Sequence, residues 1–182
     1  SWIYGFPEYG PKQRDAIVKA KRVSNPGCYA IASISILHPL VISGIISTDW
    51  PVTINAVSGY SGGGKGLIAA FEDPTSSKYT EAPFYPYGLN LEHKHLPEIT
   101  IRSGLKRAPV FVPSVGRYAQ GMIVQIPLPL WSIPGEPQPA DLHAALAKHY
   151  GGQKFVSVAA MEDARVMHNL EPETLNGTNE LH

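Results

Sequence analysis

Apolar residues recur at helical spacing in three stretches of the chain. The segment 11–20, "PKQRDAIVKA", starts with proline and is predicted to form a short helix. The run "YAIASISILHPL" is apolar almost throughout, which predicts a buried helix that begins at Cys28 or Tyr29 and stops near Pro39. The stretch 140–150, "ADLHAALAKHY", has one apolar face and is followed by a glycine that can cap the end of a helix.

Shorter apolar runs, bounded by glycine and proline, predict four strands. Residues 72–98 are polar and contain four prolines, which predicts a long loop of the kind that is usually functional or mobile. Helices and strands alternate in mixed order without an internal repeat or linker. We therefore predict one α+β domain over 1–182, with a mixed, mostly antiparallel sheet flanked by helices. The predicted strands are 52–59, 108–115, 121–131 and 154–161.

Composition narrows the class of protein. The chain has 182 residues, with 15 Lys+Arg against 15 Asp+Glu, so its formal charge gives no sign of a nucleic-acid or membrane-surface partner. No apolar run is long enough to cross a bilayer. A single cysteine cannot form an internal disulfide, which favours a reducing, cytoplasmic location. The chain starts without Met, and we expect it to be part of a longer protein.

That cysteine, Cys28, lies in "VSNPGCYA", where the predicted buried helix begins. A thiol attacks as the thiolate, and the free N–H groups of a helix N-terminus stabilise an anion. The preceding Asn25, Pro26 and Gly27 suit a turn that brings backbone amides close to the sulfur, where they could also hold an oxyanion. The alternative is that Cys28 packs in the core as a small hydrophobic residue.

The segment "LEHKHLPEI" (91–99) places His93 and His95 two residues apart, with Glu98 three residues further on. In an extended segment the two histidines would share one side. A histidine beside a thiolate can stabilise it and act as a general acid or base. A metal pair is disfavoured because further zinc ligands are missing, so we predict no metal; a plain surface loop is the remaining alternative.

A glycine-rich stretch, "SGYSGGGKG" (58–66), matches part of a nucleotide phosphate loop. Gly59, Gly64 and Lys65 satisfy G-x-x-x-x-G-K, but Gly66 stands where Ser or Thr would hold magnesium, which argues against ATP or GTP. The loop amides and Lys65 could hold a substrate phosphate or carboxylate; a flexible turn is the alternative. No G-x-G-x-x-G follows a predicted strand, so a dinucleotide-binding fold is absent from this chain.

Five segments together resemble one known family. "YGFPE" (4–8), "NPGCYA" (25–30), "SGYSGGGK" (58–65), "HKHLPEI" (93–99) and "NGTNEL" (176–181) occur in the order found in N-acetyl-γ-glutamyl-phosphate reductases of arginine biosynthesis. The chain is similar to the catalytic, dimer-forming domain of that family, which shares its plan with aspartate-semialdehyde and glyceraldehyde-phosphate dehydrogenases. The resemblance implies a dimer or tetramer, and NADP bound mainly by a Rossmann domain outside this chain, so the isolated chain is expected to be nearly inactive.

The resemblance also implies a mechanism. Cys28 attacks the acyl phosphate and expels phosphate, and the thioester accepts hydride from NADPH to release the semialdehyde. His93 keeps the thiolate charged and then protonates the hemithioacetal oxygen. A related dehydrogenase acting on another acyl phosphate, and a cysteine-dependent acyl hydrolase, stay open as alternatives.

The remaining site residues are also carried over from the resemblance. Lys65 stands where arginine is common in the family, so a point charge replaces a bidentate fork. Gln120 stands where many members have arginine, and whether it or Arg117 contacts the substrate is left open. The implied cofactor-facing residues are Gly62, Gly63 and Asn179. The implied substrate-binding residues are Asn25, Ser58, Gly59, Ser61, Lys65, His95, Glu98 and Arg117.

Overall fold

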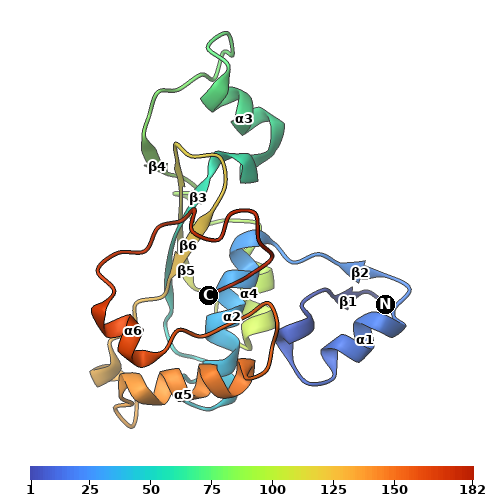
Figure 1. The fold of residues 1–182 in the computed structure, drawn as a ribbon, viewed down its shortest axis with the longest axis vertical. Coiled ribbons are helices and arrows are strands. Elements are labelled where there is room, and N and C mark those ends of the chain that lie inside the picture. Colours follow the sequence, from blue (N-terminus) through green and yellow to red (C-terminus); the bar gives the residue numbers. More distant parts are fainter.

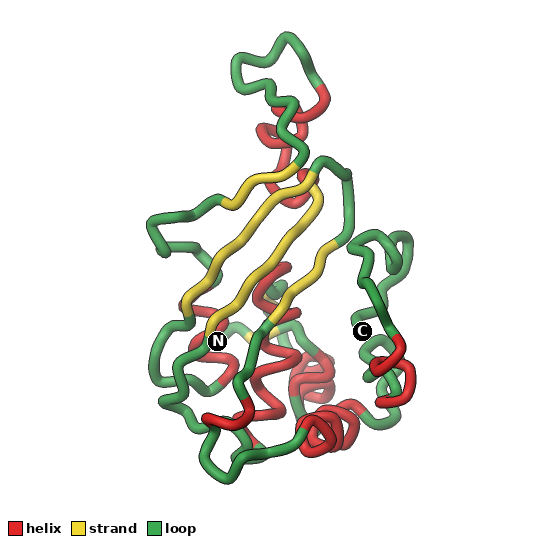
Figure 2. Tube along the Cα trace, turned by 90° about the vertical axis from the view of Figure 1, so that its left-hand side faces the viewer, coloured by secondary structure: helices red, strands yellow, loops and turns green.

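A computed structural model describes all residues, 1–182, and shows a central sheet with a long helix packed against one face (Figures 1 and 2). The sheet has four strands in the order β4-β5-β3-β6, and a two-stranded sheet of β1 and β2 lies to one side. The strands are β1 (Ile3–Tyr4), β2 (Val23–Ser24), β3 (Thr53–Gly59), β4 (Phe84–Pro86), β5 (Val110–Gly116) and β6 (Met122–Gln125). The helices are α1 (Gln13–Lys19), α2 (Cys28–Ile42), α3 (Gly64–Glu72), α4 (Leu96–Ser103), α5 (Pro139–Tyr150) and α6 (Met161–Val166).

The sheet confirms the predicted α+β class and the mixed strand directions. β3 pairs with β5 in parallel at the centre, and the outer pairs β4–β5 and β3–β6 are antiparallel. Alternate residues of the central strands, such as Ile54 and Phe111, are almost completely buried against the helical side. The other face is covered less, because Val57 and Val112 are only half-buried and Val110 is exposed.

Helix α2 forms the core of the domain. It begins after Gly27, which has extended backbone angles, and ends before Gly44, whose positive φ of 78° suits glycine. Its sides are buried nearly all round, against the sheet, α4 and α5, which explains why its sequence has no polar face. Ile34 and Leu37 are fully buried, and Ile99 of α4 packs in the same cluster.

The predicted stop at Pro39 is wrong, because α2 continues to Ile42. Proline lacks the amide that would bond the carbonyl four residues earlier, which is that of Ser35. Here the hydroxyl of Tyr150 in α5 donates to the Ser35 carbonyl at 2.8 Å and supplies the missing donor. Burial raises the pKa of Tyr150, so this hydroxyl keeps its proton.

Two of the four strand predictions need correction. The strand predicted at 121–131 ends at Gln125, because Pro127 and Pro129 cannot donate to a ladder. The strand predicted at 154–161 is wrong: only an isolated bridge joins Val156 to Leu181, and the segment finds no longer partner. The strands predicted at 52–59 and 108–115 are confirmed to within two residues.

The helices predicted at 11–20 and 140–150 are confirmed as α1 and α5. The stretch 72–98 is not one loop, because it contains β4 and the start of α4. Helices α3, α4 and α6 were not predicted; each is short, with nine residues or fewer, so it holds too few turns for a clear apolar repeat. No helix is long and apolar enough to span a membrane.

Candidate active site

Cys28 is the first residue of α2, and its side chain is exposed. The buried alternative for this thiol is therefore wrong. The turn before it is packed tightly against the histidine segment: a Cβ atom on Gly27 would lie 2.6 Å from Cδ2 of His95. Only glycine allows the ring of His95 to lie against the backbone that leads into the helix. The local sequence thus places an accessible sulfur on the first turn of a helix, where the backbone amides have no partner within the helix.

The thiol opens into a cleft of about 540 Å³ at the end of the sheet where α2 begins. Three chain segments that are distant in sequence meet there: the start of α2, the glycine loop after β3, and the histidine segment before α4. Tyrosines of β4 and of the segment that follows it form another part of the wall. The lining residues are Cys28, Tyr29, Ser58, Gly62, Gly63, Leu67, Tyr85, Tyr87, His93, Lys94, His95 and Val115.

The two histidines lie together, although the segment is not extended as assumed. It forms a turn that leads into α4, and the ring centroids of His93 and His95 are 4.8 Å apart. The backbone amide of His95 donates to Nδ1 of His93 at 3.1 Å. Since Nδ1 accepts this bond, the proton of the neutral His93 ring is on Nε2. His93 is therefore held as a neutral donor, with Nε2–H as its free group.

The surroundings keep both rings neutral at pH 7. Burial lowers the pKa of His93, and the nearby His95 and Lys94 lower it further. Burial also lowers the pKa of His95; the Glu98 carboxylate opposes this effect, and Lys94 adds to it. A neutral ring donates a hydrogen bond to an anion without contributing a full positive charge of its own.

Tyr29 joins the wall of the cleft to the sheet, and the sequence alone did not single it out. Its hydroxyl lies 2.7 Å from Oγ of Ser58 and 3.0 Å from the Ser114 carbonyl oxygen. A carbonyl can only accept, so the tyrosine proton goes to Ser114 and the serine hydroxyl can donate to Tyr29. Burial raises the pKa of Tyr29, which keeps it protonated. Ser58 thus lines the cleft in an orientation set by Tyr29 of α2.

The glycine loop forms a turn of 3-10 helix, Tyr60–Gly63, that leads into α3. Gly59 is buried where a Cβ would lie 2.6 Å from the backbone of Ala119, so this position also requires glycine. The amide of Ser61 donates to the Ala119 carbonyl at 3.1 Å, which anchors the loop. Gly62 and Gly63 line the cleft, whereas Lys65 is exposed on the first turn of α3 and is not part of the lining.

Arg117 has a different role from the predicted one. Its guanidinium donates to the backbone carbonyls of Phe71 at 3.2 Å, Ala82 at 3.4 Å and Thr80, and its Cζ lies 5.2 Å from the centre of the Phe71 ring. These bonds hold the segment after α3 against the end of β5. The side chain is therefore occupied outside the cleft. Gln120, the other residue left open, is exposed and does not line the cleft either.

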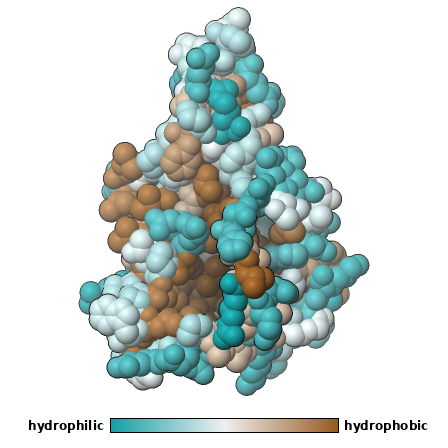
Figure 3. Space-filling model, turned by 60° about the vertical axis from the view of Figure 1, so that its left-hand side comes forward, coloured by the Kyte–Doolittle hydropathy of each residue, from teal (hydrophilic) through white to brown (hydrophobic).

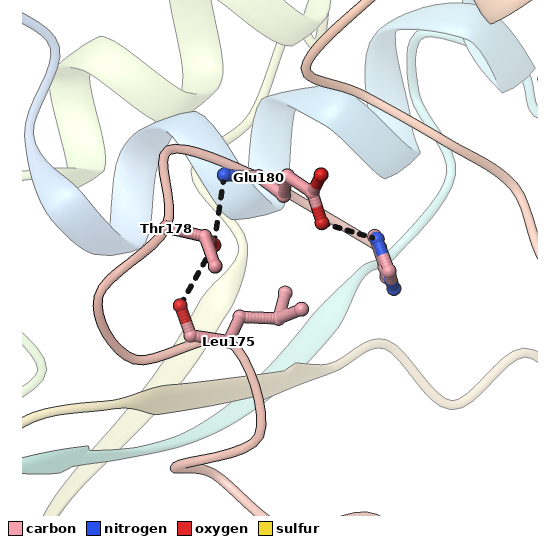
Figure 4. Close-up of polar contacts among 4 residues, drawn as sticks. Leu175, Thr178 and Glu180 are labelled. Atoms are coloured by element: carbon pink, nitrogen blue, oxygen red, sulfur yellow. Dashed lines mark hydrogen bonds and ion pairs between the residues drawn. The ribbon is translucent and has the colours of Figure 1, made fainter.

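Asn25 and Asn179 also lie outside the lining of the cleft. Asn25 is exposed, three residues before the cysteine. Asn179 belongs to a C-terminal turn in which Oγ1 of Thr178 donates to the Leu175 carbonyl at 2.8 Å and accepts the Glu180 amide at 3.2 Å (Figure 4). Glu98 lies behind the cleft, where it bonds the Gly27 amide instead of facing the open space.

Lys94 also lines the cleft, although the sequence alone did not indicate it as a site residue. It is the cation among the residues that line the cleft, and it stands between the two histidines that were singled out. Its position inside the His-x-His motif was the available signal. No group of three or more His, Cys, Asp or Glu side chains lies close enough together to hold a metal ion.

The fold and the cleft define a class: an α+β domain that presents one thiol, at a helix start, to a cleft shared with two histidines and a glycine loop. The family-level comparison agrees with this description. The chain belongs to the semialdehyde dehydrogenase dimerisation domain family, whose model matches residues 28–182.

Two longer relatives are similar to this chain over almost its whole length. It is 46% identical over 184 residues to an N-acetyl-gamma-glutamyl-phosphate reductase of Trichormus variabilis, covering 98% of this chain and 57% of that protein. It is 47% identical over 176 residues to the protein of the same name from Brucella ovis, covering 97% of this chain and again 57% of the relative. The chain thus spans little more than half the length of these relatives.

Proposed function

We propose that this chain is the catalytic domain of an N-acetyl-γ-glutamyl-phosphate reductase, which reduces N-acetyl-glutamyl phosphate to the semialdehyde and phosphate in arginine biosynthesis. The observation that carries the proposal is the exposed Cys28 thiol at the start of α2, in one cleft with His93. The names of the relatives support the substrate. The unpaired cysteine supports a reducing, cytoplasmic location.

The proposed reaction has two halves, and Cys28 carries the acyl group between them. The thiolate attacks the carbonyl carbon of the acyl phosphate, a C–S bond forms, the C–O bond to phosphate breaks, and phosphate leaves. A bound nicotinamide cofactor would supply hydride to the same carbon. The resulting oxyanion then re-forms its C=O bond, the C–S bond breaks, and the aldehyde and the thiolate are released.

In this scheme His93 acts as a hydrogen-bond donor. The reaction begins and ends with the Cys28 thiolate. Over this cycle the substrate carbon gains hydride and loses phosphate, so no proton needs to be transferred to the oxyanion. The neutral ring with its Nε2–H can donate to the developing negative charge, which is the group that an oxyanion site requires. Its bonded Nδ1 argues against the protonation step expected from the resemblance, because giving up Nε2–H would leave an imidazolate.

The residues of this chain fit one side of a nicotinamide cofactor. Gly62 and Gly63 present backbone without side chains to the cleft, and Tyr85 and Tyr87 provide aromatic surface that suits a flat ring. The rest of a dinucleotide cofactor is commonly bound by a strand followed by G-x-G-x-x-G, and this chain contains no such motif. We infer that the cofactor is NADP, and that a nucleotide-binding domain outside this chain holds most of it.

Self-association is also part of the proposal. The sheet face turned away from α2 carries half-buried Val57 and Val112, and exposed Phe84 and Val110 lie on neighbouring strands. Figure 3 shows hydrophobic side chains gathered on the side of the molecule where the sheet is uncovered. A second copy of the chain could cover this face, which the description of the family as a dimerisation domain supports.

A turnover assay tests the function directly. The protein that carries both this chain and a nucleotide-binding domain should oxidise NADPH when N-acetyl-glutamyl phosphate is added, and release one phosphate per NADPH consumed. Release of phosphate and free N-acetyl-glutamate without NADPH oxidation would instead favour the acyl hydrolase. Faster turnover with a different acyl phosphate would favour a related semialdehyde dehydrogenase.

Lys94 is expected to bind the negative charge of the substrate. Lys94→Met should raise the KM for the acyl phosphate about tenfold, since one partly exposed ion pair with phosphate contributes roughly 1–1.5 kcal/mol. The reaction itself should slow less, because Cys28 and His93 are unchanged. Steady-state kinetics over a range of substrate concentrations, at fixed NADPH, measure both effects.

The same change at Lys65 distinguishes the two lysines. Lys65 lies outside the lining of the cleft, so Lys65→Met should change the KM by less than about twofold. A larger rise in KM for Lys65→Met than for Lys94→Met would return the anion-binding role to the glycine loop.

A further inference from the structure

Glu98 occupies an unusual position for the third residue of a helix. At that position in α5, Asp141 accepts the amide of its own N-cap residue, Gln138, at 2.8 Å, which is the ordinary capping arrangement. In α4 the equivalent residue is Glu98 and the N-cap residue is His95. The Glu98 carboxylate instead accepts the amide of Gly27, with Oε1 at 3.0 Å and Oε2 at 3.3 Å. It therefore caps the helix that carries Cys28, not its own.

Tyr4 holds this carboxylate in place. Its hydroxyl donates to Oε1 of Glu98 at 2.7 Å, and the Arg102 guanidinium lies 4.5 Å from the centre of its ring. Burial raises the pKa of Tyr4, and the bond to Glu98 raises it further, so the hydroxyl stays protonated. Tyr4 lies on β1, whose partner β2 leads directly into the turn before Cys28, and the Gly5 amide donates to the Ser24 carbonyl at 2.8 Å.

The engagement of Glu98 has a consequence for His93. Because the carboxylate is turned toward Gly27, the N-cap amide of α4 is left to another acceptor. That acceptor is Nδ1 of His93, which lies 3.1 Å from the His95 amide. This bond fixes the ring and leaves Nε2–H as its free donor. One carboxylate therefore sets the position of both the thiol and the donor ring.

We propose that Tyr4 is a positioning residue for the catalytic pair: it holds Glu98 on the Gly27 amide, which fixes Cys28 at the start of α2 and leaves the His95 amide to orient His93. For turnover this inference rests on the proposed function. The orientation of His93 does not, because it is a property of the folded chain. The same contacts link the active site to the N-terminal segment of the chain, which is distant in sequence from the residues that line the cleft.

The test uses Tyr4→Phe, which removes only the hydroxyl. One carboxylate oxygen is then free to compete for the His95 amide, as in an ordinary capping box. We expect kcat to fall about tenfold, which is the effect of one hydrogen bond to a charged group, with KM within about twofold. In ¹⁵N–¹H spectra of the labelled chain, His93 should change from the Nε2–H form to a mixture of tautomers. His93→Gln identifies its signals among the seven histidines.

Tyr9→Phe is the matched control. The hydroxyl of Tyr9 also donates to α4, to the Arg102 carbonyl at 2.8 Å, and its ring lies 6.1 Å from that of Tyr4, but it does not contact Glu98. This variant should lose comparable stability and keep kcat and the His93 signals near those of the wild type. An equal loss of kcat in both variants, or an unchanged His93 tautomer in Tyr4→Phe, would overturn the proposal.

A second pair of variants keeps the test decisive if Tyr4→Phe does not fold. Glu98→Gln retains an oxygen that can accept from both Gly27 and Tyr4, so it should keep most of the activity that Glu98→Ala loses. Equal kcat in these two variants would overturn the proposal. If the wild-type protein reduces no acyl phosphate, the proposed function fails, yet the His93 spectra of the tyrosine and glutamate variants still decide whether the positioning is real.

Discussion

Replacing Cys28 by serine should lower turnover about 10³-fold or more in the protein that includes the nucleotide-binding domain. A serine hydroxyl is a far weaker nucleophile than a thiolate at neutral pH, and its alkoxide is a far worse leaving group. Both halves of the proposed reaction therefore slow, which corresponds to about 4 kcal/mol or more in activation free energy. Stopped-flow measurement of NADPH oxidation should show neither steady turnover nor a first-turnover burst.

The fold should be unaffected by this change, because Cys28 is exposed and the backbone amide of Gly27 donates to the Glu98 carboxylate whichever side chain stands at position 28. The melting temperature of Cys28→Ser should stay within about 2 °C of the wild type. Iodoacetamide should label the wild-type chain once and the variant not at all, since the chain has one cysteine. Near-normal turnover by the serine variant would exclude a covalent mechanism at this residue.

Replacing His93 by alanine should lower kcat about 10²- to 10³-fold, which is the cost of losing one donor to a developing oxyanion. Glutamine offers a neutral N–H at a similar reach, so His93→Gln should recover about tenfold over alanine. A full transfer of a proton by His93 would give a different result: glutamine would then be no better than alanine. Comparing kcat for the two variants separates the donor role from the acid role.

The pH dependence follows from the neutral state of the ring. Because burial and neighbouring groups lower the pKa of His93, its contribution to activity should hold until the pH falls below the ordinary histidine value of about 6.5. Protonation puts a hydrogen on Nδ1, which then faces the His95 N–H, so the ring loses its anchor. The part of the acid limb of kcat that comes from His93 should be absent in His93→Gln, whereas any part that comes from the thiol should remain.

The free energy of unfolding should also decrease as the pH falls. His93 and His95 both have lowered pKa values in the folded chain, so the unfolded chain binds protons more readily. Stability is then fully present above the unfolded value, roughly 6.5, and is lost progressively as the pH falls below it. Urea unfolding at several pH values between 5 and 8 measures this loss.

The sequence by itself indicated the candidate nucleophile, Cys28, and where the helix that carries it begins. Pro26 and Gly27 before an apolar run predicted a helix start at Cys28, because the signals for a helix N-terminus are local. The glycine loop was also evident from the sequence. A Cβ atom at Gly59 or Gly63 would clash with neighbouring atoms, so these positions require glycine and appear as a short glycine-rich motif. The α+β class followed from the order of helical and strand patterns, which depends on neighbours in the chain.

Only the tertiary structure decided which side chains face the cleft, because that depends on contacts between distant segments. Arg117 is tied to carbonyls of residues 71–82, Glu98 is turned toward Gly27, and Lys94 supplies the cation that was expected from Lys65. Likewise α2 passes through Pro39 because Tyr150, 115 residues after Ser35, donates to the carbonyl that proline leaves free. The sequence lists the available donors and acceptors, but the packing of the core selects which of them meet.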